Sequence, residues 1–297
     1  SALNNWHNLC FFIVSSSLII RMSPLNQRGS KMNILKKSLA VFSLGLALIL
    51  SSASALAIPV TQLGFILDAS GSVSSSNYNL MRSGLNSALA GLPTDSSVEI
   101  TVVTYATGSS VVVAPTVLTA VSLMGIQSAI TTHIKTGGGT NTGGGIDTTV
   151  AAMIGSANFA DPGTTSLINL MTDGVPNSQS AAETASANAA TAGIDALSIE
   201  AIGSGVSSAT ALANQLLVTF PATATILAVN ETNISNPLGG SWVVPVSDFT
   251  ALAAVLDAKV QASITPPGGT VPEPSTLALF AISLIGFGLS SGKRRRA

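Results

Sequence analysis

Charged side chains and cysteine are both scarce in this sequence. Only 8% of its 297 residues are charged, and it has one cysteine, Cys10. A single cysteine excludes a fold held together by disulfide bonds, and a hydrophobic content of 46% excludes a highly charged disordered chain. The length fits one globular domain with extensions at its ends.

The few charges are unevenly distributed along the chain. Residues 1–57 hold five basic residues and no acidic one, and residues 272–297 hold four basic residues and one acidic one. Between them, residues 58–271 hold twelve acidic and three basic residues, which gives a net charge of −9. A region so poor in lysine and arginine does not neutralise a run of phosphates, so we expect no nucleic acid as its partner. Cations suit it better.

The N-terminal part has the pattern of an export signal. From Met32 the chain has a short basic stretch, an apolar run over residues 38–50, and small residues that end in Ala55-Leu56-Ala57. These are the three parts of a secretory signal peptide. We therefore predict a signal peptide over residues 32–57, cleaved after Ala57. Residues 1–31 lack an initiator methionine, and we expect them to be an upstream extension from a misplaced start site.

The C-terminal part, residues 272–297, has the pattern of a sorting signal. It joins Pro272-Glu273-Pro274, an apolar segment over residues 277–289, and a basic cluster over residues 293–296, and it follows a linker over residues 266–271. This order resembles the PEP-CTERM sorting signal. The resemblance implies that an exosortase-type processing enzyme removes the tail and releases or attaches the protein at the envelope of a Gram-negative bacterium. Before processing, the apolar segment is expected to enter the membrane.

Between these ends, residues 58–265 alternate apolar runs of strand length with stretches of helical spacing. The expected strands are 62–67, 98–105, 111–118, 166–172, 196–202 and 242–246. The expected helices are 77–92, 121–134, 146–157, 180–192, 208–217 and 249–264. This alternation predicts an α/β fold with a doubly wound, mostly parallel sheet and helices on both faces.

Three details of the sheet follow from the same pattern. The strand 111–118 follows 98–105 closely enough to be its antiparallel hairpin partner, which gives one antiparallel edge strand. The strand 242–246 is expected at the other edge. The long connection over residues 217–241 contains either an extra strand at 225–229 or an inserted binding loop.

Oxygen-bearing side chains lie where three of the expected strands end. They are Asp68, Ser70, Ser72, Thr140 and Asp173. The first three follow the strand 62–67, Thr140 lies in the glycine-rich segment 137–145 ahead of a helix, and Asp173 ends the strand 166–172. Ligands of doubly wound sheets bind beyond the carboxyl ends of the strands, so we expect these side chains to meet there.

An all-oxygen donor set with two carboxylates selects a hard divalent cation. The small number of charges suits Mg²⁺ or Mn²⁺ with retained waters better than a Ca²⁺ cage. Zinc is disfavoured because the chain beyond residue 57 contains one histidine, His133, and no cysteine.

The motifs DASGS, GGGTNTG and LMTDGVPN resemble the metal-ion-dependent adhesion site of the von Willebrand factor type A domain. The resemblance extends over residues 58–265 and implies that domain's Rossmann-like fold. It also implies that Ser70, Ser72 and Thr140 contact the metal directly, with Thr142 the less favoured hydroxyl. Asp68 and Asp173 are then expected to act through water or to change role when ligand binds.

The resemblance also implies a function. In that family a carboxylate of the ligand often completes the coordination of the metal. We therefore expect an exported binding or adhesion protein that engages an acidic group on an envelope or matrix protein or an exopolysaccharide. The alternative is a structural envelope component whose metal site only stabilises the fold.

Enzymatic functions find little support in the sequence. The segment Gly203-Ser204-Gly205 imitates a dinucleotide-binding loop, but it follows the fifth strand instead of the first. We expect its glycines to allow a tight turn beside the metal site. A serine hydrolase would have to recruit His133, which we expect to be exposed near a helix end, and no Gly-x-Ser-x-Gly elbow is present. We expect no enzyme.

Overall fold

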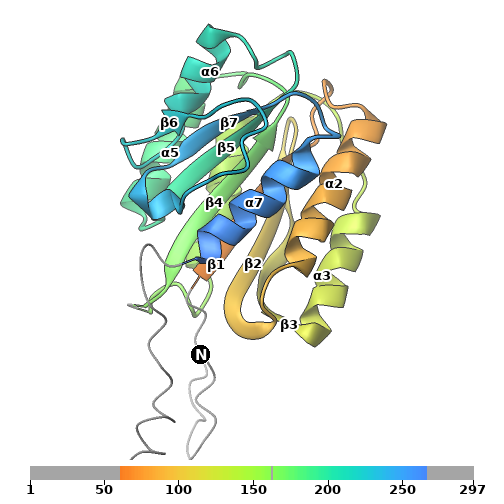
Figure 1. Cartoon of the computed structure of the whole chain (residues 1–297), viewed down its shortest axis with the longest axis vertical. Coiled ribbons are helices and arrows are strands. Elements are labelled where there is room, and N and C mark those ends of the chain that lie inside the picture. Colours follow the sequence, from red (N-terminus) through yellow and green to blue (C-terminus); the bar gives the residue numbers. More distant parts are fainter. Residues whose placement is uncertain (1–60, 162, 266–297) are drawn as a thin grey trace, which may run out of the picture. The chain divides into compact units, whose positions relative to one another are not determined.

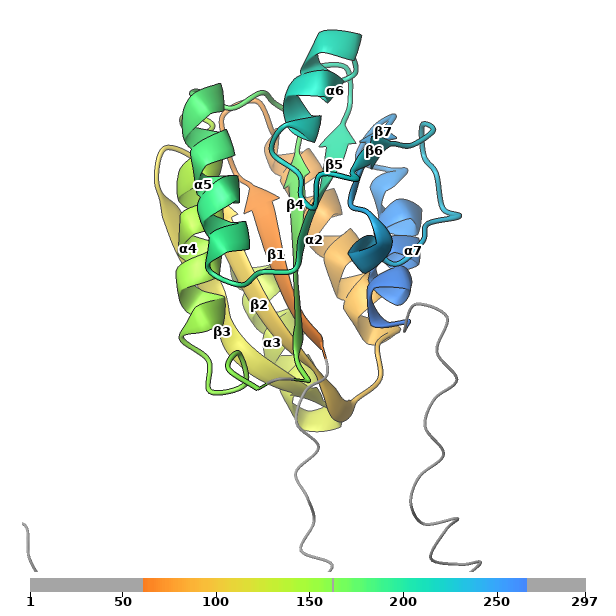
Figure 2. The same cartoon turned by 90° about the vertical axis from the view of Figure 1, so that its left-hand side faces the viewer.

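The structure of the protein is a computed structural model that describes residues 61–161 and 163–265. These residues form a seven-stranded sheet with helices on both faces (Figures 1 and 2), so the predicted fold class is confirmed. The upstream extension, the signal peptide, the linker and the sorting segment lie outside the described residues. Among the described residues, no helix is long and apolar enough to cross a membrane.

The elements alternate along the chain as predicted. The strands are β1 (Thr61–Asp68), β2 (Asp95–Tyr105), β3 (Ser109–Thr119), β4 (Thr165–Thr172), β5 (Ala196–Ile202), β6 (Thr225–Ile226) and β7 (Trp242–Val246). The helices are α2 (Ser75–Ala90), α3 (Ala120–Thr132), α4 (Thr142–Ile154), α5 (Gln179–Thr191), α6 (Ala209–Leu216) and α7 (Leu252–Ile264). A single 3₁₀ turn spans Pro237–Gly239.

The strands lie in the order β3-β2-β1-β4-β5-β7-β6. β3 pairs with β2 in the antiparallel sense and all other pairs are parallel, which confirms the antiparallel edge strand. The prediction that residues 242–246 form the other edge is wrong, because the two-residue strand β6 pairs outside β7, with Thr225 opposite Trp242. The connection over residues 217–241 thus contains a short extra strand.

Each face of the sheet is covered by its own set of helices. α2, α3 and α7 pack on one face and α4, α5 and α6 on the other (Figures 1 and 2). Along β1, Phe65 and Leu67 face the first set and Ile66 the second. Because both faces are covered, every residue of β1 and β5 is buried, including polar ones such as Gln62 and Glu200.

Every helix begins within four residues of its predicted start, and two helices differ from it by three residues or more. α4 begins four residues before residue 146, because the Asn141 side chain accepts a hydrogen bond of 3.1 Å from the Gly144 N–H and caps the helix. α7 begins three residues after residue 249. There, Asp248 Oδ1 accepts from the backbone N–H groups of Thr250 at 2.8 Å and Ala251 at 3.1 Å, which forms a separate turn.

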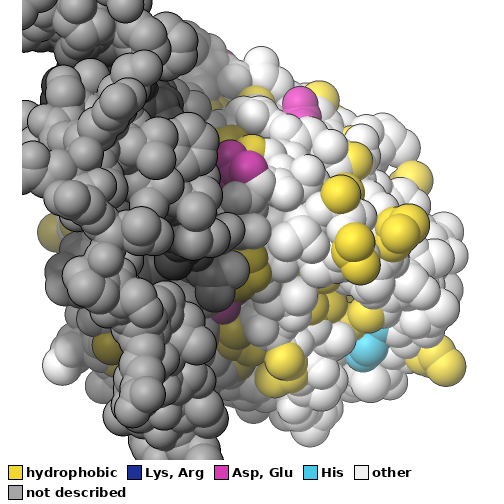
Figure 3. Space-filling model, turned by 90° about the horizontal axis from the view of Figure 1, so that it is seen from below, with side chains coloured by type: hydrophobic (Ala, Val, Ile, Leu, Met, Phe, Trp, Pro, Cys, Tyr) yellow, Lys and Arg dark blue, Asp and Glu magenta, His cyan; other side chains and the backbone are white. Residues whose placement is uncertain are grey.

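Some large apolar side chains of the described residues are exposed, among them Val121, Met124 and Ile134. Figure 3 shows one face of the molecule, on which the hydrophobic side chains of described residues are scattered in small groups among polar atoms. Scattered apolar side chains are normal on a soluble surface.

A buried ion pair fixes the last helix to the sheet. Lys259 of α7 and Glu200 of β5 are both fully buried and form a salt bridge, and Lys259 Nζ lies 4.4 Å from the centroid of the Trp242 ring. Burial lowers the pKa of Lys259, and the Glu200 carboxylate counteracts this shift. Within the described residues neither charged group has another hydrogen-bond partner, so each charge is compensated by the other alone.

Lys259→Met should leave the buried Glu200 carboxylate without its counter-charge. We expect the free energy of unfolding to fall by about 3–5 kcal/mol, as is typical when one partner of a buried pair is removed. Urea denaturation followed by circular dichroism measures this loss. In the matched variant Lys259→Met/Glu200→Leu no charge stays buried, and most of the stability should return. A single variant as stable as the parent would contradict a stabilising role for this pair.

Candidate metal centre

The candidate metal centre begins at the end of β1. Asp68 and Ser70 are fully buried, and Ser72 is exposed. Asp68 Oδ1 accepts a hydrogen bond of 2.8 Å from the Ser70 N–H, and the hydroxyl oxygens of Ser70 and Ser72 are 3.0 Å apart. The turn after the strand therefore places the two serine hydroxyls side by side.

Asp173, directly after β4, joins this pair of hydroxyls. Its Oδ1 accepts a hydrogen bond of 2.5 Å from Ser72 Oγ. Burial raises the pKa of the half-buried Asp173, the nearby Asp68 raises it further, and the hydrogen bond from Ser72 opposes both effects. Two carboxylates that share so small a volume are stabilised in their charged form by a cation placed between them and the hydroxyls.

Thr140 reaches the same place from the glycine-rich segment. A Cβ atom built on Gly174 would lie 3.6 Å from Ser72 Oγ and 3.7 Å from Thr140 Oγ1, so both hydroxyls border the space that Gly174 leaves open. The carbonyl oxygen of Thr140 accepts a hydrogen bond of 2.9 Å from the Asn177 N–H, which ties the two loops together. All five residues predicted from the sequence thus lie around the carboxyl ends of β1 and β4.

The glycine-rich segment is anchored and is more than a flexible loop. Backbone hydrogen bonds run from the Gly71 N–H to the Gly138 carbonyl at 2.8 Å and from the Gly137 N–H to the Ala69 carbonyl at 2.9 Å. The expectation of a loop up to residue 145 is wrong, because α4 begins at Thr142. Thr142 is buried in the first turn of that helix.

The glycines in the first turn of α4 allow close packing. A Cβ on Gly145 would lie 3.1 Å from ring carbons of Tyr105 and 3.2 Å from Ile66, and a Cβ on Gly143 would lie 2.9 Å from the Ala181 carbonyl oxygen. Side chains at these positions would push α4 away from the sheet and from α5. The run of glycines therefore brings the Thr140 loop close to β1.

Two residues that the sequence analysis missed hold the Asp68 carboxylate. Its Oδ2 accepts hydrogen bonds from Thr172 Oγ1 at 2.7 Å and from the Tyr105 hydroxyl at 3.1 Å. Both oxygens of Asp68 are thus occupied by protein donors, which is compatible with contact to a metal through water. The sequence contained a signal for both residues, because Thr172 and Tyr105 are the last residues of the strands that pair with β1 on either side.

The donor set fits a small hard cation. At Mg–O distances of about 2.0–2.1 Å, neighbouring ligand oxygens of an octahedral site lie about 2.9 Å apart, and the Ser70 and Ser72 hydroxyl oxygens are 3.0 Å apart. Within residues 61–161 and 163–265, no three His, Cys, Asp or Glu side chains are grouped to hold a metal, so such a site depends on hydroxyls. Hydroxyls, carboxylates and water are ligands that suit Mg²⁺ and Mn²⁺.

The turn after β5 packs against the same centre. A Cβ on Gly205 would lie 2.5 Å from the Asp173 carbonyl oxygen, and Gly203 has a φ of +79°. The expected tight turn beside the metal site is thus present in the structure, and the resemblance to a dinucleotide-binding loop has this steric origin.

His133 lies elsewhere, at the C-terminal end of α3. Its Nδ1 is 2.9 Å from the Tyr78 hydroxyl. The expectation that this side chain is exposed is wrong, because contact with α2 leaves it half-buried. Burial lowers the pKa of His133, and the positive charge of Arg82 adds to this effect.

Comparison with known families agrees with this geometry. Residues 62–224 match the von Willebrand factor type A domain, and residues 270–296 match the PEP-CTERM protein-sorting motif. The chain belongs to the von Willebrand factor type A domain family and carries a C-terminal sorting motif. No curated protein sequence shows a significant match.

Solved structures share the fold at low sequence identity. Proximal thread matrix protein 1 from the mussel byssus is 16% identical with a TM-score of 0.54, over 69% of this chain and 47% of that protein. Its form with a zinc-occupied MIDAS motif is 17% identical with a TM-score of 0.51, over 68% and 48%. The pilus adhesin SpaC from Lactobacillus rhamnosus GG is 15% identical with a TM-score of 0.51, over 68% and 30%. The match thus spans less than half the length of these proteins, and it shows the fold alone.

Gly145→Ala should destabilise the protein, because the added Cβ meets the ring of Tyr105, whose hydroxyl is bound to Asp68. We expect a loss of about 1–3 kcal/mol in the free energy of unfolding, as for overpacked cores. Gly125→Ala in α3 is the matched control, since nothing lies within 4 Å of its Cβ position, and it should stabilise by about 0.5–1 kcal/mol. Chemical denaturation of both variants checks this, and equal effects would contradict the packing argument.

Proposed function

We propose that this protein is an exported binding module of the cell envelope or its surroundings, whose domain uses Mg²⁺ or Mn²⁺ to engage an acidic group of a partner. The observation that carries the proposal is the convergence of hydroxyl and carboxylate oxygens at one end of the sheet. The residues that would hold the metal are Asp68, Ser70, Ser72, Thr140 and Asp173.

The position of this centre supports contact with a partner. Ser72 is exposed, and Thr140 and Asp173 are partly exposed, whereas Asp68 and Ser70 are buried beneath them. A divalent metal bound here would be reached from solvent on the Ser72 side. With only two carboxylates nearby, such a metal keeps positive character and accepts an outside carboxylate as a ligand.

The residues of the chain have separate tasks in this scheme. Thr172 and Tyr105 orient Asp68, so that the buried carboxylate stays fixed behind the site. Ser70, Ser72 and Thr140 would supply hydroxyl oxygens to the metal. When bound, the metal supplies the Lewis acidity that attracts the partner's carboxylate.

The sorting motif supports action outside the cytoplasm. A PEP-CTERM motif at residues 270–296 is compatible with export, with a membrane-anchored stage through residues 277–289, and with processing by an exosortase-type enzyme. We propose that the domain then works at the outer surface or is shed.

We further propose that the protein is a binding protein and not an enzyme. The histidine that a serine hydrolase would need is His133, and its Nδ1 lies 2.9 Å from the Tyr78 hydroxyl. Among the described residues, no hydrogen bond joins His133 to a serine or an aspartate. A nucleophile activated by a general base is therefore not assembled there.

The structural neighbours are compatible with both the proposed function and its alternative. One is named a pilus adhesin and the other a thread matrix protein. In the alternative, this protein is a structural matrix component whose metal site only stabilises the fold. The two functions differ in whether a partner depends on the metal.

Metal binding should raise the melting temperature of the purified protein. A ligand at about 100 times its Kd stabilises a protein by about 2.7 kcal/mol, and this corresponds to a rise of several degrees. We expect that rise between EDTA and millimolar Mg²⁺ or Mn²⁺ in the parent, and we expect it to be absent in Asp68→Ala/Asp173→Ala. Asp257→Ala, which removes an exposed carboxylate of α7, is the control and should respond as the parent does.

The effect of a chelator separates the two functions. A binding module loses its acidic partner in EDTA while its circular dichroism spectrum stays folded. Both lose the stabilisation by metal in EDTA, but a structural component has no chelator-sensitive partner. Identical melting temperatures with and without metal in the parent would contradict both the metal site and the proposed mechanism.

A further inference from the structure

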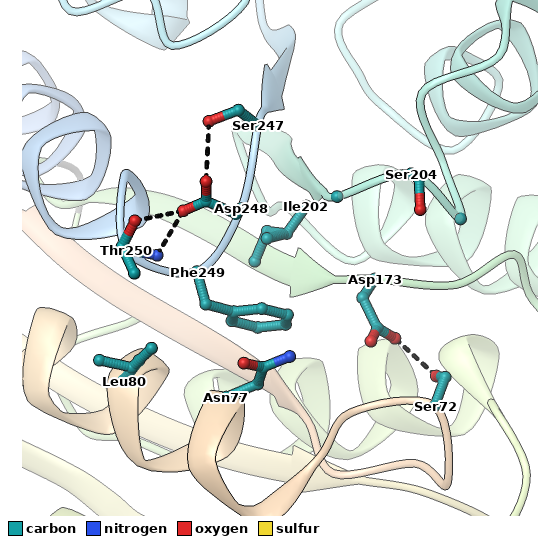
Figure 4. A pocket seen from close by; sticks show the side chains of 12 residues that line it. Ser72, Asn77, Leu80, Asp173, Ile202, Ser204, Ser247, Asp248, Phe249 and Thr250 are labelled. Carbon is teal, nitrogen blue, oxygen red and sulfur yellow. Dashed lines mark hydrogen bonds between the residues drawn. The ribbon is translucent and has the colours of Figure 1, made fainter.

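A pocket of about 470 Å³ lies directly beside the candidate metal centre (Figure 4). Ser72 and Asp173 of the metal centre form one side of it, and residues 247–250, between β7 and α7, form another. Ligand pockets typically have volumes of about 300–1,000 Å³. A partner whose carboxylate reaches the metal therefore has its neighbouring groups at the mouth of this pocket.

The charge of the pocket is negative. Its lining residues are Ser72, Asn77, Leu80, Asp173, Ile202, Gly203, Ser204, Gly205, Ser247, Asp248, Phe249 and Thr250. Asp173 and Asp248 are the two charged members of this set. Because Asp173 belongs to the metal centre, Asp248 is the carboxylate that remains for a ligand. No lysine or arginine of the described residues lines this pocket, so Asp248 has no counter-charge there.

Asp248 has one oxygen available. Its Oδ1 is used by the turn before α7, where it accepts from two backbone N–H groups and the Thr250 hydroxyl. Its Oδ2 makes only a long contact of 3.5 Å with Ser247 Oγ. The side chain is exposed, and the hydrogen bonds hold the pKa of Asp248 below its usual value. It therefore presents a charged, nearly unpaired oxygen.

The rest of the pocket suits an aliphatic stem. Leu80 supplies an exposed apolar side chain over the buried Ile202 and Phe249, and Asn77 and Ser204 supply neutral polar groups (Figure 4). Lysine and arginine side chains combine an apolar stem, which packs along such surfaces, with a charged head. An apolar wall with an acidic group beside it matches that combination.

We infer that this pocket receives a basic side chain of the same partner whose acidic group binds the metal, with Asp248 as its counter-charge. This inference rests on the proposed function and narrows it. The partner is then a protein segment in which an acidic residue lies close to a lysine or arginine. A polyuronate chain fits poorly, because it would place further carboxylates beside Asp248.

A set of peptides tests this inference. The probes are end-blocked hexapeptides that each contain one aspartate. A second test residue, which is arginine, glutamine or glutamate, stands one, two or three positions after the aspartate. We expect the purified chain, in millimolar Mg²⁺ or Mn²⁺, to bind the best arginine peptide about fivefold more tightly than its glutamate analogue, as for an exposed charge pair. Isothermal titration calorimetry or fluorescence anisotropy measures these affinities.

Asp248→Asn is the matched variant. Asparagine retains an oxygen that caps the turn before α7 but lacks the charge, so the melting temperature should stay close to that of the parent. The preference for arginine over glutamate should disappear in this variant, and binding of an oligogalacturonate should be weak in the parent and become tighter. Higher salt should reduce the arginine preference in the parent.

The outcomes separate the inference from the proposed function. Metal-dependent peptide binding without an arginine preference, or with a preference that Asp248→Asn leaves intact, would overturn the inference alone. Tighter binding of the oligogalacturonate than of every peptide would do the same. If neither peptides nor oligogalacturonate bind in a metal-dependent way, the proposed function fails as well.

Discussion

The buried carboxylate of Asp68 is the constraint on which the rest of the site depends. A charged group without partners in the interior costs several kcal/mol, so the protein must supply a donor for each oxygen. The donors come from the Ser70 N–H, Thr172 and Tyr105, that is, from the ends of β1, β4 and β2. Satisfying one carboxylate therefore fixes the register of three neighbouring strands at their carboxyl ends. The following turn, which carries the serine hydroxyls, is then held by the backbone hydrogen bonds that Ala69 and Gly71 make with the glycine-rich segment.

Close approach of the backbone is the second requirement. The Thr140 loop reaches β1 only because α4 packs tightly, with Gly145 against Tyr105. The turn after β5 reaches Asp173 only because Gly205 has no side chain, since a Cβ there would lie 2.5 Å from the Asp173 carbonyl oxygen. Glycine costs conformational entropy on folding. Its concentration in these two segments is explained by steric contact with the residues of the candidate metal centre.

Much of this arrangement could be predicted from the sequence, and the remainder depends on tertiary contacts. β5 has the predicted bounds, Ala196–Ile202, because it is a short apolar run buried on both faces. The start of α4 was missed because one side chain, Asn141, caps the helix ahead of three glycines with low helix propensity. For the connection that contains β6, the sequence allowed either a strand or a loop, because a strand of two residues carries no periodic pattern. The proposed role of Asp248 could not be predicted from the sequence. Asp248 lies many residues after Asp173, and only the order of the strands in the sheet brings the two residues to the same pocket.

In the proposed function, the charge of the whole region would give a bound metal a particular role. Residues 58–271 carry a net charge of −9, so the metal-free domain repels an acidic partner. The field of exposed charges is screened over about 8 Å at physiological ionic strength, whereas a bound divalent cation acts at contact distance. In the proposed function, attraction would be confined to the metal, and repulsion would act on every further negative charge of the partner. A partner with one acidic group and a neighbouring basic group satisfies both conditions, because its acid meets the cation and its base meets the surrounding negative field.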